Sequence, residues 1–240
     1  MLNCYFFFSI THYYHWSAEL FFGFWRTYSS LDPSISADGS SSLPALRRIW
    51  FPHADADHWR DYASMNQWVL RSAFPSATAE YSADWQDRVE MGRPVILDRV
   101  IFSDRSAAMK GENFSYTGRT ASEAFALPGS VHWWTIIRGA VTKFSGLDEE
   151  LDQGSKPVIT YISRQEWGRR KLIEEDHEKL VKALYKLRDQ YGVEVNVVSM
   201  DKLSHAEQFR LAARTTVRAL CLSNHQDMSD SGRSFFLHRL

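Results

Sequence analysis

The feature that most constrains the fold is an alternation of strand and helix patterns across residues 156–222. Residues 158–162 are dense in β-branched and aromatic side chains, which is typical of a buried strand. After a basic loop, apolar residues recur at helical spacing over residues 173–191, and Gly192 stands where a helix C-cap is expected. This stretch therefore predicts a strand, a basic loop and an amphipathic helix.

The same pattern is repeated further along the chain. Residues 193–198 have the composition of a strand, and residues 215–222 that of another. Between them, Ser204 and Glu207 have the spacing of a capping box that opens a helix through Arg214. Strand, helix, strand, helix and strand with short loops predict a parallel βαβαβ unit, so the fold class is α/β.

After the first of these strands, which ends at Ser163 and Arg164, a loop carries a basic cluster at Arg169, Arg170 and Lys171. Guanidinium groups beside the backbone N–H groups of a helix N-terminus favour a polyanion such as a diphosphate. Ligands of open α/β sheets bind at the carboxyl ends of the strands, which is where this loop lies. The alternative is that these arginines are solvated surface charges, as most charged side chains are.

Composition limits the partners. The net charge is −1, so we expect no nucleic-acid partner and only a local anion site. The two cysteines, Cys4 and Cys221, predict neither a disulfide framework nor a metal site. No stretch reaches the roughly 18 apolar residues of a membrane span, and residues 1–10 lack the basic region of a signal peptide.

The N-terminal part is expected to fold separately, with a boundary in the acidic, glycine-containing stretch 146–154. We predict domains at 1–150 and 151–222, and a tail at 223–240 that lies outside the folded core, because it lacks periodicity. The elements expected in the first domain are helices at 16–28, 119–127 and 131–144, a helix that includes Trp59 and Leu70, strands at 48–51, 94–97 and 99–102, and loops at 29–44 and 110–118.

His15 and Glu19 are four residues apart, so both side chains face the same side of the first helix. A histidine and a carboxylate in that arrangement can handle a proton during group transfer. The alternative is a half-buried pair in an aromatic-rich helix.

Asp55 and Asp57 have the DxD form that binds a divalent ion in some glycosyltransferases, through oxygen ligands. The favoured interpretation is that Asp57 is the N-cap of the next helix. We therefore predict no metal ligands, and metal dependence stays open.

Two groups of residues carry a resemblance to a known family. The first comprises residues 161–164, 169–170, 174–175, 194–195 and 211–214, and the second residues 13–19. The first group resembles the catalytic domain of glycosyltransferase family 61, and the second resembles its N-terminal signature. That family includes the EGF-domain O-linked N-acetylglucosaminyltransferases and plant xylosyl- and arabinosyltransferases, and this chain is most similar to its fungal members.

The resemblance implies a GT-B-like fold with two Rossmann-like domains, the N-terminal one on the acceptor side. It implies inverting transfer from a nucleotide sugar, expected to be a UDP-sugar, to a hydroxyl of a protein or glycan in the Golgi or endoplasmic reticulum lumen. The implied roles are Glu19 as the base, His15 as orienter, Ser163, Arg164, Arg169 and Arg170 as diphosphate ligands, and Glu174 and Glu175 as further donor contacts.

The chain departs from the family pattern at two places. His12 stands where the family has Asn, and no GxHGxxLxH-type loop follows Thr216. We therefore expect the C-terminal domain to be incomplete. This leaves two alternatives, a catalytically inactive remnant that retains the anion loop, and a carbohydrate-binding module that uses some of the nine tryptophans.

Overall fold

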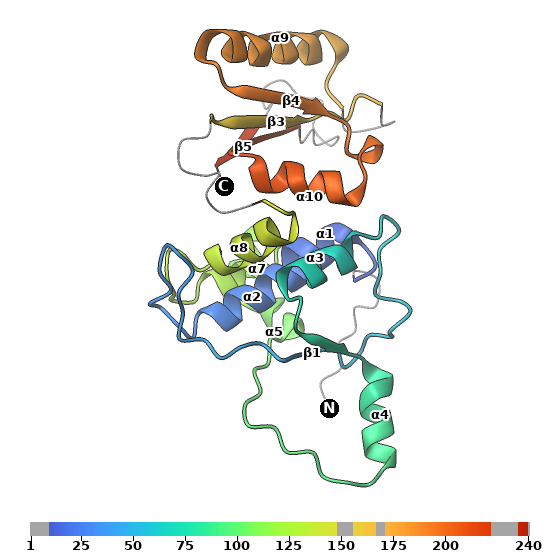
Figure 1. Cartoon of the computed structure of the whole chain (residues 1–240). Coiled ribbons are helices and arrows are strands. Elements are labelled where there is room, and N and C mark those ends of the chain that lie inside the picture. Colours follow the sequence, from blue (N-terminus) through green and yellow to red (C-terminus); the bar gives the residue numbers. More distant parts are fainter. Residues whose placement is uncertain (1–9, 148–155, 167–170, 222–234, 240) are drawn as a thin grey trace. The chain divides into compact units, whose positions relative to one another are not determined.

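The computed structural model describes residues 10–147, 156–166, 171–221 and 235–239. It is a mixed α/β protein with two small sheets, both of which contain parallel strands (Figure 1). The chain divides into two compact units, Met1–Val141 and Thr142–Leu240. Each unit is described by itself below.

The C-terminal unit is built on a four-stranded sheet in the order β4-β3-β5-β6. β3 (Val158–Ile162) pairs in parallel with β4 (Glu194–Val198) on one side and with β5 (Val217–Cys221) on the other. Helices α9 (Glu174–Tyr191) and α10 (His205–Arg214) cover opposite faces of the sheet in Figure 1. The predicted parallel βαβαβ unit is confirmed.

Local signals explain where the two helices begin and end. Gly192 adopts a left-handed φ of 66° and donates its N–H to Arg188 O, so it ends α9 as expected of a glycine C-cap. Ser204 and Glu207 form the predicted capping box at the start of α10, because each side chain accepts from the backbone N–H of the other residue.

Tyr161 and Leu184 are the buried centre of the core between β3 and α9. The Tyr161 hydroxyl lies 3.1 Å from Nδ1 of His177. His177 of α9 is therefore packed against Tyr161 of β3.

β6 (Phe235–Arg239) pairs antiparallel with β5, so this part of the predicted tail is a strand of the sheet. The expectation that 223–240 lies outside the folded core is wrong for these residues. The apolar cluster at 235–237 gives them strand propensity, and the edge of β5 supplies the hydrogen-bonding partner. Residues 223–234 and 240 lie outside the described residues.

The N-terminal unit is organised around one continuous helix, formed by α1 (Tyr13–His15), the π-helix η1 (Trp16–Phe21) and α2 (Phe22–Ser29). The predicted helix is confirmed, but its first part is π-helical rather than α-helical. Buried aromatic and aliphatic side chains, with Trp16, Trp25 and Ile137 among the least exposed, form the core along it.

The remaining elements are short. They are β1 (Arg48–Trp50), α3 (Met65–Ala73), β2 (Thr78–Glu80), α4 (Ser82–Glu90), α5 (Arg105–Ala108), α6 (Glu112–Thr117), α7 (Ala121–Phe125), α8 (Thr135–Phe144) and, in the C-terminal unit, the 3-10 helix η3 (Met200–Lys202). The predicted loop 110–118 is wrong because it contains α6, and α3 and α8 begin later than predicted.

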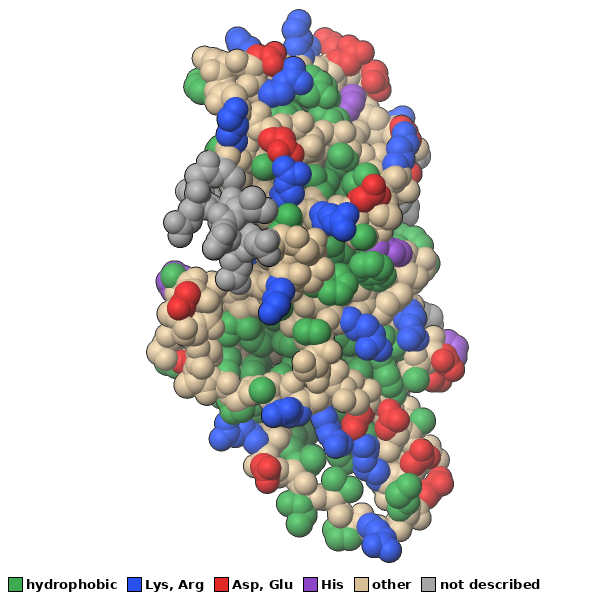
Figure 2. Space-filling view, viewed as in Figure 1, with side chains coloured by type: hydrophobic (Ala, Val, Ile, Leu, Met, Phe, Trp, Pro, Cys, Tyr) green, Lys and Arg blue, Asp and Glu red, His purple; other side chains and the backbone are tan. Residues whose placement is uncertain are grey.

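The two strands predicted at 94–97 and 99–102 are also wrong. Residues 91–104 form neither helix nor strand, and the segment loops from the end of α4 to α5 (Figure 1). Ile101 packs against the core, but the other hydrophobic side chains of this segment are exposed, with Ile96 at 89% and Phe102 at 73%. Hydrophobic side chains stand on the lower end of the surface in Figure 2. A β-rich composition yields a strand only where another strand pairs with it.

None of the helices in the part of the chain that the structure describes has both the length and the hydrophobicity needed to cross a membrane.

Candidate functional site

His15 and Glu19 form a hydrogen-bonded pair on the first helix. Nδ1 of His15 lies 3.1 Å from Oε2 of Glu19, so the predicted shared face is confirmed. The Glu19 side chain is only 6% exposed, whereas that of His15 is 40% exposed. The pair lies where α1 passes into the π-helix η1, and π-helical turns are frequent at functional sites.

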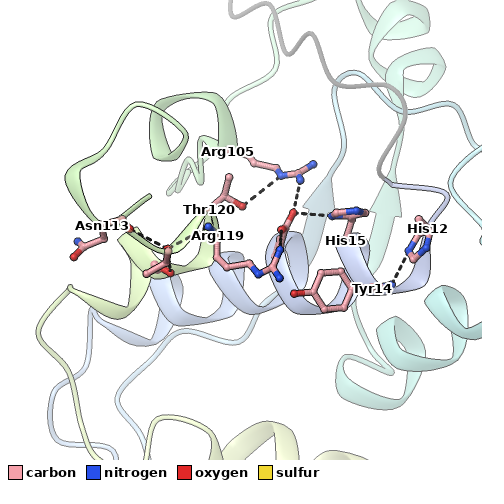
Figure 3. Close-up of polar contacts among 10 residues, drawn as sticks. His12, Tyr14, His15, Arg105, Asn113, Arg119 and Thr120 are labelled. Atoms are coloured by element: carbon pink, nitrogen blue, oxygen red, sulfur yellow. Dashed lines mark hydrogen bonds and ion pairs between the residues drawn. The ribbon is translucent and has the colours of Figure 1, made fainter. Parts of the chain in front are cut away.

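Two arginines approach the same carboxylate. Nη2 of Arg105 donates to Oε2 of Glu19, and Nη1 of Arg119 lies 4.0 Å from Oε1. In Figure 3, Arg105 and His15 point toward the same carboxylate, and Arg119 lies beside the ring of Tyr14, 5.2 Å from its centroid. Glu19 is therefore a buried anion held by a histidine and by a guanidinium.

The sequence interpretation missed both arginines. Asp104 accepts from the N–H groups of Ser106 and Ala107, which starts α5 and makes Arg105 its first residue. The Asp104 cap could have been recognised in the sequence. The contact with Glu19 could not, because Glu19 and Arg105 are 86 residues apart.

A pocket of about 340 Å³ lies beside Glu19, and we refer to it as the Glu19 pocket. Its walls come from the η1–α2 helix, from the end of the extended segment with α5, and from α7. The lining residues are Glu19, Leu20, Gly23, Thr27, Phe102, Ser103, Asp104, Arg105, Ala107, Ala108, Thr120, Glu123, Ala124 and Leu127.

The second predicted site is the loop after β3 in the C-terminal unit. Ser163 donates its N–H to Val198 O at 2.8 Å, and its hydroxyl accepts from the N–H of Gln165. Arg164 is half-buried at the strand end. Arg169 and Arg170 lie outside the described residues, so their place relative to Arg164 stays a prediction.

Gln165 holds the two ends of this loop together, which the sequence interpretation did not anticipate. Its Nε2 donates to Leu172 O, and its Oε1 accepts from the N–H of Leu172, both at 3.1 Å. Nε2 also lies 3.2 Å from Oε2 of Glu174. This clamp fixes the base of the loop that carries Arg169 and Arg170 in the sequence.

The first turn of α9 carries Glu174, Glu175 and Asp176. Glu174 accepts from Gln165, and Glu175 pairs with Lys179 at 2.6 Å in an exposed position. Carboxylates already occupy the end of the helix where a bound anion would gain from the dipole. An anion site here would therefore depend on the arginines of the loop more than on the helix terminus.

The DxD motif is a local turn. Oδ1 of Asp55 accepts from the N–H of Asp57, and Oδ2 lies 3.2 Å from Nδ1 of His58. These contacts, with that from Asp57 the larger, lower the pKa of Asp55. The N-cap of α3 is Ser64, so the prediction that Asp57 caps it is wrong. Among the described residues, no three or more His, Cys, Asp or Glu side chains gather in a way that could hold a metal.

Comparison of the chain with protein-family models, with curated proteins and with solved structures found no match. Function is therefore inferred from the residues and the geometry described above.

Proposed function

We propose that the chain is an inverting glycosyltransferase that moves a sugar from a nucleotide-sugar donor, expected to be a UDP-sugar, to a hydroxyl of a protein or glycan. The proposal includes a GT-B-like pairing of two Rossmann-like domains and a location in the Golgi or endoplasmic reticulum lumen, both taken from the family resemblance. The single observation that carries it is the buried Glu19 carboxylate, bonded to His15 and Arg105 at the edge of a pocket.

The chemistry needs a group that removes a proton from the acceptor. A bond forms between the acceptor oxygen and the anomeric carbon, while the bond from that carbon to the diphosphate oxygen breaks. The acceptor proton must pass to a base on the protein. The charge that develops on the leaving diphosphate is stabilised by cations.

The family resemblance implies that Glu19 is the base and that His15 orients it. The burial of the two side chains supports the reverse assignment, with His15 as the base and Glu19 as the orienting group. Glu19 is almost fully buried, and its Oε2 is already engaged by His15 and Arg105. His15 is partly exposed, and its Nδ1 faces Glu19, which leaves Nε2 as the nitrogen that could take the proton. In this arrangement Glu19 orients the imidazole through Nδ1, and Arg105 fixes the carboxylate.

The loop after β3 is the proposed site of the donor diphosphate. Arg164 follows the carboxyl end of β3, and Gln165 closes the base of the loop. A guanidinium can bind phosphate through two parallel hydrogen bonds.

The test is calorimetric titration of the full chain with UDP and with UDP-sugars, followed by measurement of UDP release when a glycan acceptor is added. We expect UDP to bind more tightly than ADP, because a donor site distinguishes the base, whereas a nonspecific anion patch would bind both equally. Absence of UDP binding, or equal affinity for UDP and ADP, would contradict the assignment of the chain as a glycosyltransferase.

A further inference from the structure

We propose that the Glu19 pocket binds a small, uncharged, hydroxyl-rich ligand of about one sugar ring, and that it excludes phosphorylated ligands. The volume of about 340 Å³ is that of a small pocket, near the lower end of the range of about 300–1,000 Å³ for small-molecule sites. A pocket of this size fits a monosaccharide unit better than a complete nucleotide sugar.

The charges of the lining argue against an anionic ligand. The charged residues are three carboxylates, Glu19, Asp104 and Glu123, and one guanidinium, Arg105. The guanidinium is already paired with Glu19. A phosphate in the pocket would therefore meet uncompensated negative charge.

The carboxylates are held in place by groups of the protein. Asp104 accepts from two backbone N–H groups at the start of α5. Glu123 accepts from the N–H of Phe114 at 2.6 Å. Gly111 makes room for Glu123, since a Cβ at Gly111 would lie 2.1 Å from its carboxyl carbon. The acceptor oxygens of the pocket are thus positioned before a ligand arrives.

Hydrogen-bond acceptors dominate the polar part of the lining. Nη1 of Arg119 lies 4.0 Å from Oε1 of Glu19, which is beyond hydrogen-bond distance. The hydroxyl of Thr27 donates to Gly23 O at 2.8 Å, so toward a ligand it can act as an acceptor. A ligand that donates several O–H groups matches this lining.

The rest of the lining is apolar, with Leu20, Ala108, Ala124 and Leu127 among its members. Such a wall suits the C–H face of a sugar ring. A cationic ligand would match the acceptors, but it would lie beside the guanidinium of Arg105, which lines the same pocket. The identification of this ligand as the glycosyl acceptor rests on the proposed function, whereas the binding of the ligand does not.

The experiment uses the full chain and saturation-transfer NMR with methyl β-D-glucoside and methyl β-D-xyloside as probes. We expect both glycosides to bind, and glucose 1-phosphate to bind at least tenfold more weakly. Ala108→Leu adds bulk inside the pocket and should abolish binding. The matched control is Ala83→Leu, on the exposed face of α4, which should bind the glycosides as the unchanged chain does.

A second variant keeps the test decisive if Ala108→Leu does not fold. Gly23→Ala places a methyl group in the pocket, and its Cβ would lie 3.9 Å from Ala121, which is ordinary van der Waals contact. We expect it to fold and to weaken glycoside binding at least threefold. Unchanged glycoside binding in Gly23→Ala would overturn the proposal. So would the absence of glycoside binding to the unchanged chain. The proposal would also be overturned if glucose 1-phosphate, an anion, or ethanolammonium, a cation, bound the unchanged chain as tightly as the glycosides or more tightly.

The titration with UDP separates the two proposals. Glycoside binding without UDP binding would support the pocket and contradict the transferase. UDP binding without glycoside binding would contradict the pocket and leave the transferase in place.

Discussion

Nδ1 of His15 and Oε2 of Glu19 lie 3.1 Å apart, with the carboxylate buried and the imidazole partly exposed. The same Oε2 accepts from Arg105, so one carboxylate oxygen joins the first helix of the chain to α5. The pair therefore contributes to the stability of the fold through Glu19 and to the proposed proton transfer through His15. The two contributions can be measured separately.

The chemical consequence is tested by His15→Ala. We expect the rate of UDP release in the presence of acceptor to fall by about 10²–10⁴-fold, which is the usual contribution of a positioned base. Affinity for UDP should not change, because the donor loop is elsewhere in the sequence. His58→Ala is the control, since His58 also contacts a carboxylate but is 76% exposed. An equal rate loss in both variants would contradict the assignment of His15.

The structural consequence is tested by Glu19→Ala. Removing one partner of a buried ion pair leaves the other charge unpaired, so we expect a loss of about 3–5 kcal/mol in the free energy of unfolding. Urea unfolding followed by tryptophan fluorescence reports on the N-terminal unit, because eight of the nine tryptophans lie in residues 1–141. His58→Ala breaks an exposed pair with Asp55 in the same unit and should cost less than about 1 kcal/mol. Similar losses in both variants would show that Glu19 is not held as described.

Arg164 and Lys182 provide a matched comparison for the donor site. Arg164→Ala should weaken UDP binding by about 2–3 kcal/mol, roughly a hundredfold, through loss of a charge-assisted contact to phosphate. Lys182 lies on the exposed face of α9, so Lys182→Ala should change the affinity little. Calorimetry measures both, and equal weakening would place the phosphate site elsewhere.

Asp32 gives the N-terminal unit an acid-sensitive element. Hydrogen bonds from the side chain of Ser34, from the N–H groups of Ser42 and Ser34, and from the hydroxyl of Ser41 hold the pKa of this buried carboxyl well below its usual range. Because the folded state favours the ionised form, this stabilisation is present above the usual aspartate pKa of about 3.9 and is lost as the pH falls toward the lowered folded value.

The measurement for Asp32 is the thermal unfolding midpoint between pH 6 and pH 2. We expect Asp32→Asn to unfold several degrees below the unchanged chain at pH 6, and the difference between the two midpoints to shrink below about pH 4. Asp189→Asn, on the exposed end of α9, is the control. A difference that stays constant down to pH 2 would mean that the charge of Asp32 is not what stabilises the loop.

The βαβαβ part of the C-terminal unit could be predicted because its signals are local. The β-branched run of β3, the glycine after α9 and the capping box at Ser204 each act within a few residues. The pairing of His15 with Glu19 was predictable for the same reason, since helical spacing alone sets it.

The rest depends on contacts that no local pattern encodes. Residues 94–102 have strand composition, yet they meet no partner strand. Arg105 reaches Glu19 from a position far along the chain, and Gln165 becomes a clamp only when both ends of its loop lie together. Each of these outcomes is decided by tertiary neighbours rather than by propensity.

The extended segment 91–104 joins α4 to α5 without forming helix or strand. Arg99 lies within it and is exposed, so a trypsin-like protease should cut the backbone there before it reaches the packed helices. Such a cut would put Glu19 and Arg105 on separate polypeptides, joined by their ion pair and by the packing of α2 against α7. The lining of the Glu19 pocket therefore comes from both sides of Arg99. A protein cleaved at Arg99 should retain the pocket as long as its two fragments stay associated.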